Sequence, residues 1–449
     1  MTADPQRGTN GVLSKAPEDP KSGLSRRSLF ARTGAAALGA TTLAGLAGCE
    51  NTTTPVAASG AASGGPGLLG DPTAGGPVDS AGIPLARRDY PVTLPRFSEP
   101  VSASEKPETG GVFKIYSYAD YLNPDVLKEF GKQEGVEVKV TTFDSVDEAF
   151  SKLSTAGLEF DVIVSTPDQL SKLVGRKLLQ PLNEELVPNL EKNIWEEIHS
   201  PFYDVGSRYT VPYVVYTTGI GWRNDKVNVD PASLENGWDA LWDATSQRGK
   251  TQLLDDKREA LGMAMLREGQ PDLNTASPEI VNIALAALDE LAQNVKPKVQ
   301  ISAYETLPAG RITIGQMWSG DLLSGTINYL PKGTPASALS YWYQAEGGPV
   351  FNDILTVAAA SKKPIIAHRF LNYMMEPQVA YDNFVNYVGY QPPQKSLNAA
   401  KLFDEGILPK SLSNAVVTQE AYAAGNGFLT LTAEGEQAWE KAWSKFRAG

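Results

Sequence analysis

The sequence predicts an α/β protein of two lobes with a ligand cleft between them. Strand and helix patterns alternate from residue 112 onward, and they resume after a long apolar run at 211–222. The chain has 449 residues, which is more than one compact domain of ordinary size. Because ligand pockets favour the interface between such units, we expect the binding site in the cleft.

The first lobe opens with a βαβαβ pattern, which implies a parallel sheet with right-handed crossovers. The predicted strands are 112–116, 136–140 and 160–164, and the predicted helices are 124–132, 147–154 and a third from 167. Ligands of such sheets bind beyond the carboxyl ends of the strands, although polar residues there are often helix caps. Four candidate residues lie at these ends: Tyr118, Asp120, Thr166 and Asp168.

The second lobe begins after the apolar run. Helix signals recur at 237–242, 256–266 and 277–291, and strand patterns occur at 312–314 and 354–357. Asp256 and Glu259 have the spacing of a capping box, in which the aspartate caps the helix and the glutamate reaches back. This structural role and a role in ligand binding are both open for the two carboxylates. The two histidines, His199 and His368, are interpreted as structural residues.

The composition excludes several classes of function. The chain has 40 lysines and arginines against 52 aspartates and glutamates, and its net charge of -12 argues against nucleic-acid binding through phosphates. Its one cysteine excludes a disulfide framework and a cysteine-rich metal site within the chain. Its two histidines are too few for a three-histidine zinc site. We expect a small cationic partner, no metal and no cofactor.

The first 49 residues have the features of an export signal. Arg26 and Arg27 form a twin-arginine motif, and the apolar run behind it ends in LAGC, which resembles a lipobox with Cys49 as the lipidated residue. The remaining 400 residues carry 34 basic and 49 acidic side chains, a net charge of -15. Residues 50–109 are predicted to form a flexible tether and an extended strap. We expect an extracytoplasmic protein, anchored by lipid to the outer face of the cytoplasmic membrane or periplasmic.

Seven motifs follow one another in an informative order. They are YSYADY (116–121), FDVIV (160–164), VPY with GIG (211–221), LDDKRE (254–259), QMWSG (316–320), EGGPVFND (346–353) and GYQPP (389–393). Over 111–449 the chain resembles the extracytoplasmic solute-binding proteins of ABC importers, in their spermidine/putrescine-binding branch. The resemblance implies a periplasmic-binding-protein-like (Venus flytrap) fold, with crossing segments as a hinge, and a monomer that meets an ABC permease. The implied lobes are 110–214 with 352–395, and 215–351 with 396–449.

The resemblance also implies a ligand site of carboxylates and aromatic rings. Asp256, Glu259 and Asp353 stand where family carboxylates meet polyamine nitrogens. Trp318 and Tyr390 stand where aromatic side chains form the walls of the family's site. Each also has a structural interpretation: a helix cap for Asp256, core packing for Trp318, and turns for Asp353 and Tyr390.

Other positions depart from the family pattern. Phe351 and Tyr118 stand where the family often has tryptophan, and Asp168 stands where a tyrosine is usual. A glutamine that is common near the family's C-terminus has no clear counterpart, and Leu429 and Thr430 are the nearest residues. These departures leave the choice among polyamines open.

Elementary chemistry agrees with a polyamine ligand. A polyamine carries several ammonium groups on a methylene chain, so its binder needs carboxylates at amine spacing and aromatic faces for the chain. Two alternatives stay open. The same receptor fold could carry ferric iron on clustered tyrosines (Tyr116, Tyr118 and Tyr121), a sugar or another organic cation, and paired carboxylates could serve a secreted hydrolase. We expect binding rather than catalysis.

Overall fold

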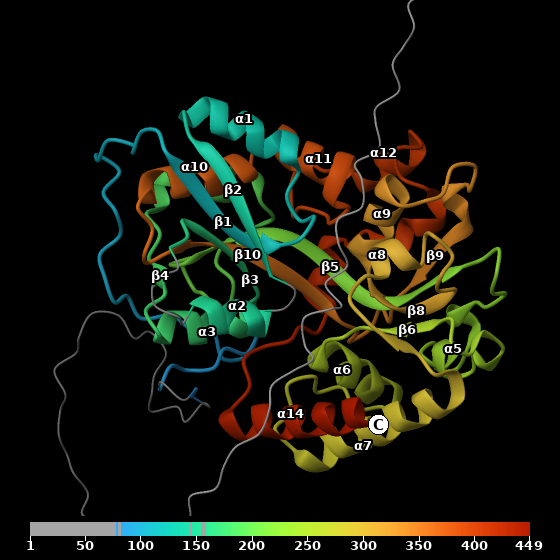
Figure 1. The fold of residues 1–449 in the computed structure, drawn as a ribbon. Helices are drawn as coiled ribbons and strands as arrows, with labels where there is room; N and C mark the ends of the chain where they lie inside the picture. Colours follow the sequence, from blue (N-terminus) through green and yellow to red (C-terminus); the bar gives the residue numbers. More distant parts are fainter. Residues whose placement is uncertain (1–77, 80–81, 144–145, 154–158) are drawn as a thin grey trace, which may run out of the picture. The chain divides into compact units, whose positions relative to one another are not determined.

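One long strand sets the architecture. β5 (Thr210–Arg223) has 14 residues, and its first part pairs antiparallel with β10 (Val350–Ala358). Its second part pairs antiparallel with β8 (Ile314–Trp318). The partner strand of β5 changes from β10 to β8 between Thr217 and Thr218. Figure 1 shows β5 beside β10 and continuing to β8, so this strand belongs to both halves of the sheet.

The structure, a computed structural model, describes most of the chain. The described residues are 78–79, 82–143, 146–153 and 159–449. The predicted export signal, with Arg26, Arg27 and Cys49, lies outside them, as do residues 50–77 of the predicted tether. Across the described ranges, no helix is both long enough and apolar enough to cross a membrane.

The sheet is mixed rather than wholly parallel. The strands are β1 (Val112–Tyr118), β2 (Glu137–Phe143), β3 (Val162–Ser165), β4 (Leu179–Gln180), β5, β6 (Thr251–Leu253), β7 (Lys298–Val299), β8, β9 (Leu339–Trp342) and β10. Their order is β2-β1-β3-β10-β5-β8-β6-β7, with β4 paired to β10 and β9 to β5. The predicted βαβαβ unit is parallel, with β1 between β2 and β3. However, β10 runs antiparallel to both β3 and β5, because it returns from the other half of the sheet.

Most predicted helices form with the expected caps. The α-helices are α1 (Pro124–Glu134), α2 (Val146–Leu153), α3 (Pro167–Gly175), α4 (Asn189–Asn193), α5 (Asp239–Trp242), α6 (Lys257–Arg267), α7 (Pro278–Val295), α8 (Ala303–Thr306), α9 (Ser319–Asn328), α10 (Pro364–Met374), α11 (Pro377–Asn383), α12 (Ala399–Asp404), α13 (Gln419–Ala424) and α14 (Ala433–Ala448), and η7 (Phe384–Val388) is a π-helical turn. Asp256 and Ser277 cap α6 and α7 with their side chains. Thr166 is the N-cap residue of α3, as predicted, but its hydroxyl makes no capping bond.

The strand predicted at 312–314 is displaced toward the C-terminus. β8 begins at Ile314 and ends at Trp318, so most of the QMWSG motif lies inside the strand rather than after it. Gly315 weakens the local strand signal, because glycine is uncommon inside strands. A close approach of the neighbouring strand requires a glycine here. A Cβ at Gly315 would come within 2.8 Å of the Gln252 side chain on the neighbouring β6. Trp318 therefore stands at the carboxyl end of a strand.

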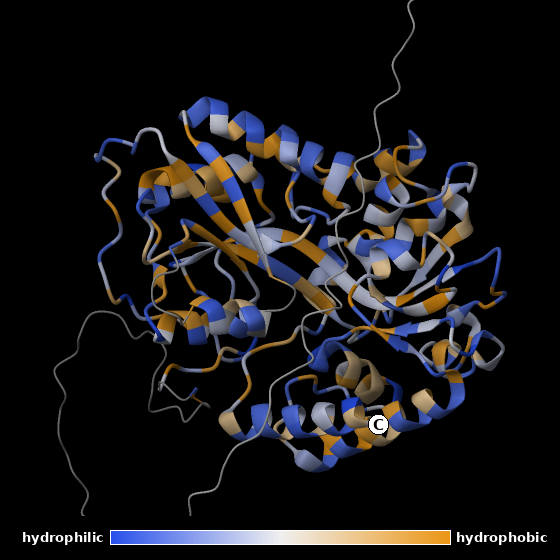
Figure 2. Ribbon diagram, viewed as in Figure 1, coloured by the Kyte–Doolittle hydropathy of each residue, from blue (hydrophilic) through white to orange (hydrophobic). Residues whose placement is uncertain are grey.

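Each half of the sheet has its own apolar core, which confirms the predicted two-lobed α/β architecture. The first lobe packs around Phe113 and Tyr116 of β1, and the second around Trp242 and Trp439. Figure 2 shows hydrophilic and hydrophobic residues alternating along α1 and α14, as in helices that bury one face. Tyr422 of α13 packs with the core of the first lobe, although the predicted boundaries assign 396–449 to the second.

Gly389 occupies a position where a side chain does not fit. It ends η7 with a φ of 75°, and a Cβ there would lie 2.2 Å from the backbone nitrogen of Ser324. We expect Gly389→Ala to lower the free energy of unfolding by about 2 to 4 kcal/mol, because the clash adds to the left-handed backbone. Gly406→Ala is the control, since Gly406 has a φ of 70° and nothing within 4 Å of its Cβ position. The control should lose only about 1 kcal/mol in urea unfolding, and equal losses would contradict the clash.

Candidate functional site

Glu259 and Trp318 are joined within the second lobe. Asp256 caps α6 by accepting the backbone N–H groups of Arg258 at 2.8 Å and Glu259 at 3.1 Å, which places Glu259 in the first turn. Oε1 of Glu259 accepts the indole N–H of Trp318 at 2.6 Å. The cap of the predicted capping box therefore forms, while the Glu259 carboxylate is bonded to an aromatic residue at the end of β8.

Asp353 lies inside β10 and is buried. The ladder between β10 and β5 shifts register between Asp353 and Ile354, and such bulges re-aim side chains. Its carboxylate accepts the Tyr121 hydroxyl at 2.6 Å and the Tyr216 hydroxyl at 3.2 Å. The interpretation of Asp353 as a turn residue is therefore wrong, since it is a strand residue held by two phenols.

Asp321 is a third buried carboxylate, and the sequence analysis missed it. It lies in the first turn of α9, where Oδ1 accepts the Tyr390 hydroxyl at 2.7 Å. Oδ2 is buried and has no hydrogen-bond partner among the residues that the structure describes. The Tyr390 ring lies against Gly320, where a Cβ would come within 2.3 Å of the ring. The glycine of QMWSG therefore admits Tyr390 to the site.

The carboxylates surround a common group of aromatic rings. The ring centroid of Tyr216 lies 5.5 Å from that of Phe351 and 5.5 Å from that of Tyr390. The Tyr216 hydroxyl bonds to Asp353, and burial with the charges of Asp353 and Glu259 raises the pKa of Tyr216. Five predicted site residues therefore meet here: Glu259, Trp318, Phe351, Asp353 and Tyr390.

Burial raises the pKa of all three carboxyl groups. The pKa of Glu259 rises to about 8, and those of Asp321 and Asp353 each rise to about 7. The charge of Asp256 adds to the effect on Glu259, whereas the hydrogen bonds from the indole and the phenols act in the opposite direction. Carboxylates that have lost water and lack a cation are costly to ionise, so a ligand that brings positive charge is favoured here.

A pocket of about 270 Å³ adjoins this cluster. Thr166, Asp168 and Phe351 line it, together with Tyr216 and Phe428. The rings of Phe351 and Phe428 stack with centroids 4.7 Å apart. The Thr166 hydroxyl is buried and finds no hydrogen-bond partner within the described part of the chain. Because Tyr216 lines the pocket and also bonds to a buried carboxylate, it links the pocket to the cluster.

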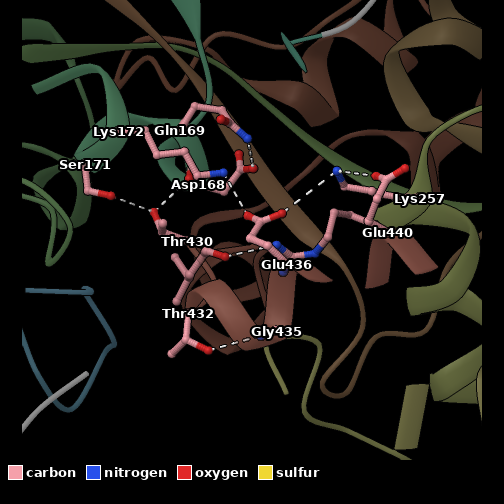
Figure 3. A network of polar contacts seen from close by, with 12 residues as sticks. Asp168, Gln169, Ser171, Lys172, Lys257, Thr430, Thr432, Gly435, Glu436 and Glu440 are labelled. Atoms are coloured by element: carbon pink, nitrogen blue, oxygen red, sulfur yellow. Dashed lines mark hydrogen bonds and ion pairs between the residues drawn. The ribbon is translucent and has the colours of Figure 1, made fainter. Parts of the chain in front are cut away.

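A polar network joins the two lobes beside the pocket (Figure 3). The Thr430 hydroxyl donates to the backbone oxygen of Asp168 at 2.7 Å. Lys172 on α3 and Lys257 on α6 pair with Glu436 on α14, with N to O distances of 2.8 Å and 3.9 Å. Helix α3 packs in the first lobe, whereas α6 and α14 pack in the second, so the Lys172–Glu436 pair and the Thr430 bond join the lobes at this edge of the pocket.

Tyr118 and Asp120 lie at the edge of the cluster. The ring of Tyr118 is 5.3 Å from that of Tyr121, so Tyr118 touches the group that holds Asp353. Asp120 is exposed and has a left-handed φ of 54°. Its carboxylate accepts hydroxyl groups of Tyr387 at 3.1 Å and Tyr329 at 3.3 Å. Asp120 is therefore not brought into the buried cluster.

Three members of the cluster escaped the sequence analysis as site residues: Tyr121, Tyr216 and Asp321. Tyr121 ends the YSYADY motif and Asp321 directly follows QMWSG, so adjacency to a motif was the available signal for both. Tyr216 lies inside the apolar run of β5, where a tyrosine has no distinguishing neighbour. Its role follows from pairing with β10, which lies more than a hundred residues away in sequence.

The described residues contain no group of three or more histidine, cysteine, aspartate or glutamate side chains that could hold a metal ion. Both histidines have structural partners. Nε2 of His368 accepts the backbone N–H of Asn183 at 3.1 Å, and a ring nitrogen of His199 bonds to the backbone oxygen of Ile194 at 2.6 Å. The candidate site is therefore built from carboxylates and aromatic rings.

Comparison with known proteins identifies relatives along most of the chain. A sequence profile described as bacterial extracellular solute-binding protein matches residues 125–408. Spermidine/putrescine-binding periplasmic protein 1 of Haemophilus influenzae is 28% identical over 301 residues, which span 67% of this chain and 78% of that protein. The spermidine/putrescine-binding periplasmic protein of Escherichia coli K12 is 26% identical over 337 residues, which span 75% of this chain and 91% of that protein.

A solved structure shares the fold. The spermidine/putrescine ABC transporter substrate-binding protein of Streptococcus pneumoniae superimposes with a TM-score of 0.60. The alignment covers 75% of this chain and 99% of that protein, at 22% sequence identity. At this identity the likeness concerns the architecture, and it agrees with the two-lobed fold described above.

Glu259 should make the stability of the ligand-free protein depend on pH. Its pKa is about 8 in the folded state against an ordinary value of 4.5, so the folded state binds more protons between these values. Its contribution is fully present below the ordinary pKa and is lost as pH rises through the folded pKa. The loss is about 1.4 kcal/mol per pH unit.

Glu259→Gln removes the titrating group and keeps the side-chain shape. We expect the fall in unfolding free energy between about pH 5 and about pH 7 to become shallower by roughly that slope. Urea unfolding at several pH values measures it. An unchanged slope would show that Glu259 is already ionised in the folded protein.

Proposed function

Because the chain belongs to the family of bacterial extracellular solute-binding proteins, we propose that it binds a polyamine between its two lobes and delivers it to an ABC importer. The two curated relatives described above are named as spermidine/putrescine-binding proteins. The proposed activity is binding and release, without chemical conversion of the ligand. A single protein molecule with one ligand site is sufficient for this function.

The observation that carries the proposal is the group of buried carboxylates. Within the described part of the chain, Glu259, Asp321 and Asp353 are each held by a hydrogen bond from an aromatic side chain rather than by a lysine or arginine. The site therefore has negative charge to offer and aromatic faces beside it. A linear chain of ammonium and methylene groups matches both features.

The expected energies are sufficient for useful affinity. A charge-assisted hydrogen bond contributes roughly 1.5 to 3 kcal/mol, and a cation over an aromatic face roughly 0.5 to 2 kcal/mol. Micromolar binding requires about 8 kcal/mol. Two or three paired ammonium groups with aromatic contacts reach this value when the contacts are good enough to offset ordering of the ligand.

Ligand charge also explains how binding would favour lobe closure. Asp353 lies on β10 in the first lobe, whereas Glu259 and Asp321 lie on α6 and α9 in the second. A polyamine that contacts both sets binds the closed arrangement more tightly than the open one, and closure follows from that difference in affinity. Because the carboxyl groups have raised pKa values, binding near neutral pH should release protons.

Asp353→Asn and Glu259→Gln should each weaken polyamine binding at least about tenfold, because each removes one charge-assisted contact. Both amides can still accept the hydrogen bonds from Tyr121 and Trp318, so the fold should be retained. Glu129→Gln is the matched control, since Glu129 lies on the outside of α1 in a pair with Lys132. Calorimetric titration with putrescine, spermidine and spermine gives the affinities.

Two results would overturn this assignment. Unchanged affinity in both variants would show that the site residues are wrong even if a polyamine binds. Absence of heat and of thermal stabilisation with all three polyamines at millimolar concentration would reject the ligand class. Turnover of chromogenic glycosides or esters that is lost in Glu259→Gln would instead support the hydrolase.

We further propose that export through the twin-arginine motif leaves Cys49 as a lipidated N-terminus that holds the protein on the outer face of the cytoplasmic membrane. The sequence order of Arg26, Arg27, an apolar run and the single cysteine supports this. Two acyl chains give stable anchoring, whereas one gives only reversible binding. The lipid would keep the receptor close to its permease.

Cys49→Ser should release the protein from the membrane fraction and abolish incorporation of labelled fatty acid. A serine at this position cannot form the thioether, and the rest of the signal is unchanged. Arg87→Gln, 38 positions after Cys49 in the sequence, serves as the control and should stay in the membrane fraction. Retention of Cys49→Ser on the membrane would contradict the lipid anchor.

A further inference from the structure

The strap, residues 82–101, is fixed to the first lobe along its length. Leu85, Val92 and Leu94 are each at most 1% exposed, and Val92 and Leu94 belong to an apolar core of that lobe. The Val92 N–H donates to the backbone oxygen of Phe202 at 2.7 Å. The Tyr209 hydroxyl donates to the backbone oxygen of Pro95 at 2.7 Å. The strap is therefore part of the folded lobe.

Between these anchors the strap makes a tight turn at the pocket. Arg87 and Tyr90 exchange two backbone hydrogen bonds, of 3.1 Å and 2.9 Å. Arg87, Arg88 and Asp89 of this turn line the same pocket as Thr166, Asp168, Tyr216 and Phe351. The turn is held on both sides, so its charged side chains are presented to the pocket by a fixed backbone.

Both guanidinium groups are held by neutral oxygens. Arg87 donates to the backbone oxygen of Thr430 at 3.2 Å. Arg88 donates to the backbone oxygens of Tyr422 and Gly425, each at 3.2 Å, and its guanidinium lies 5.5 Å from the centroid of the Phe202 ring. Carbonyl groups fix the position of a cation without cancelling its charge. The nearby carboxylates that act on the charge of Arg87 are Asp272 and Asp89.

We propose that Arg87 and Arg88 are charge-selecting residues of the ligand pocket. Three carboxylates line the pocket as well: Asp89, Asp168 and Asp272. The arginines offset two of these three charges. The arginines therefore reduce the attraction of the pocket for a cation, and the reduction grows with each further ammonium group. The strap would thus weaken the binding of long polyamines more than that of short ones. This rests on the proposed function only for the identity of the cation.

The first experiment measures the charge of the pocket without any polyamine. Gly427 lines the pocket, and a Cβ there has its nearest heavy atoms at 3.4 Å and 3.9 Å, so Gly427→Cys can carry a reporter thiol. Cys49→Ser in the same chain leaves this thiol as the only one. The readout is the ratio of modification rates with a cationic and a neutral methanethiosulfonate of similar size.

The double variant Arg87→Gln with Arg88→Gln should raise this ratio at least about threefold at low salt, and added salt should reduce the gain. Arg96→Gln is the matched control, because Arg96 is an exposed arginine of the same strap outside the pocket lining, and the ratio should not change. Arg87→Lys with Arg88→Lys keeps the charges and should behave as the parent chain. An unchanged ratio, or equal acceleration of both reagents, would overturn the proposal.

The second experiment measures affinity for putrescine, spermidine and spermine in the same variants. The gain from Arg87→Gln with Arg88→Gln should rise in that order, because each ligand carries more positive charge than the one before. A gain of the same size for all three would indicate a steric lid and would overturn charge selection. If the parent chain binds none of them while the thiol ratio still rises, the proposed function fails and the charge-selecting role of the strap stands.

Discussion

The candidate site depends on the register between β5 and β10. In this ladder Phe351 faces Tyr216 and Asp353 faces Val214, and two residues beyond Tyr216 the same strand pairs Thr218 with Trp318 of β8. A slip of one residue would turn these side chains to the opposite face of the sheet. The bond between Asp353 and Tyr216 would be lost, and the carboxylates of the two lobes would no longer share one aromatic group. One ladder thus fixes both the fold and the chemistry.

The same arrangement lowers the stability of the ligand-free protein. Three carboxylates are enclosed by rings, and burial favours their neutral forms. A fully apolar cluster would be more stable but would have nothing to offer a cation. The aromatic hydroxyl and indole donors limit the cost, because they bond to one oxygen each of Glu259 and Asp321 and to both oxygens of Asp353. Such a site gives up stability for affinity, as binding sites often do.

Local patterns predicted much of the fold and only part of the site. The parallel βαβαβ unit and the Asp256 cap follow from spacing within a few residues, whereas the displaced strand that ends at Trp318 does not. The antiparallel placement of β10 does not, because its partners β3 and β5 come from distant segments. Tyr216 and Asp321 became visible as site residues only when that pairing and the approach of Tyr390 to Gly320 brought them beside other groups. Arg87 and Arg88 belong to the predicted extended strap, and nothing in their own sequence shows that the strap turns at the pocket.

The hydrogen bond from Trp318 to Glu259 has a spectroscopic consequence. The fluorescence emission of an indole whose N–H is bonded to a carboxyl group depends on the charge of that group. A cation that pairs with Glu259 would change this charge, so its binding would become an optical signal from within the protein. The remaining seven tryptophans supply a constant background, and replacing Trp318 alone by phenylalanine would silence the signal.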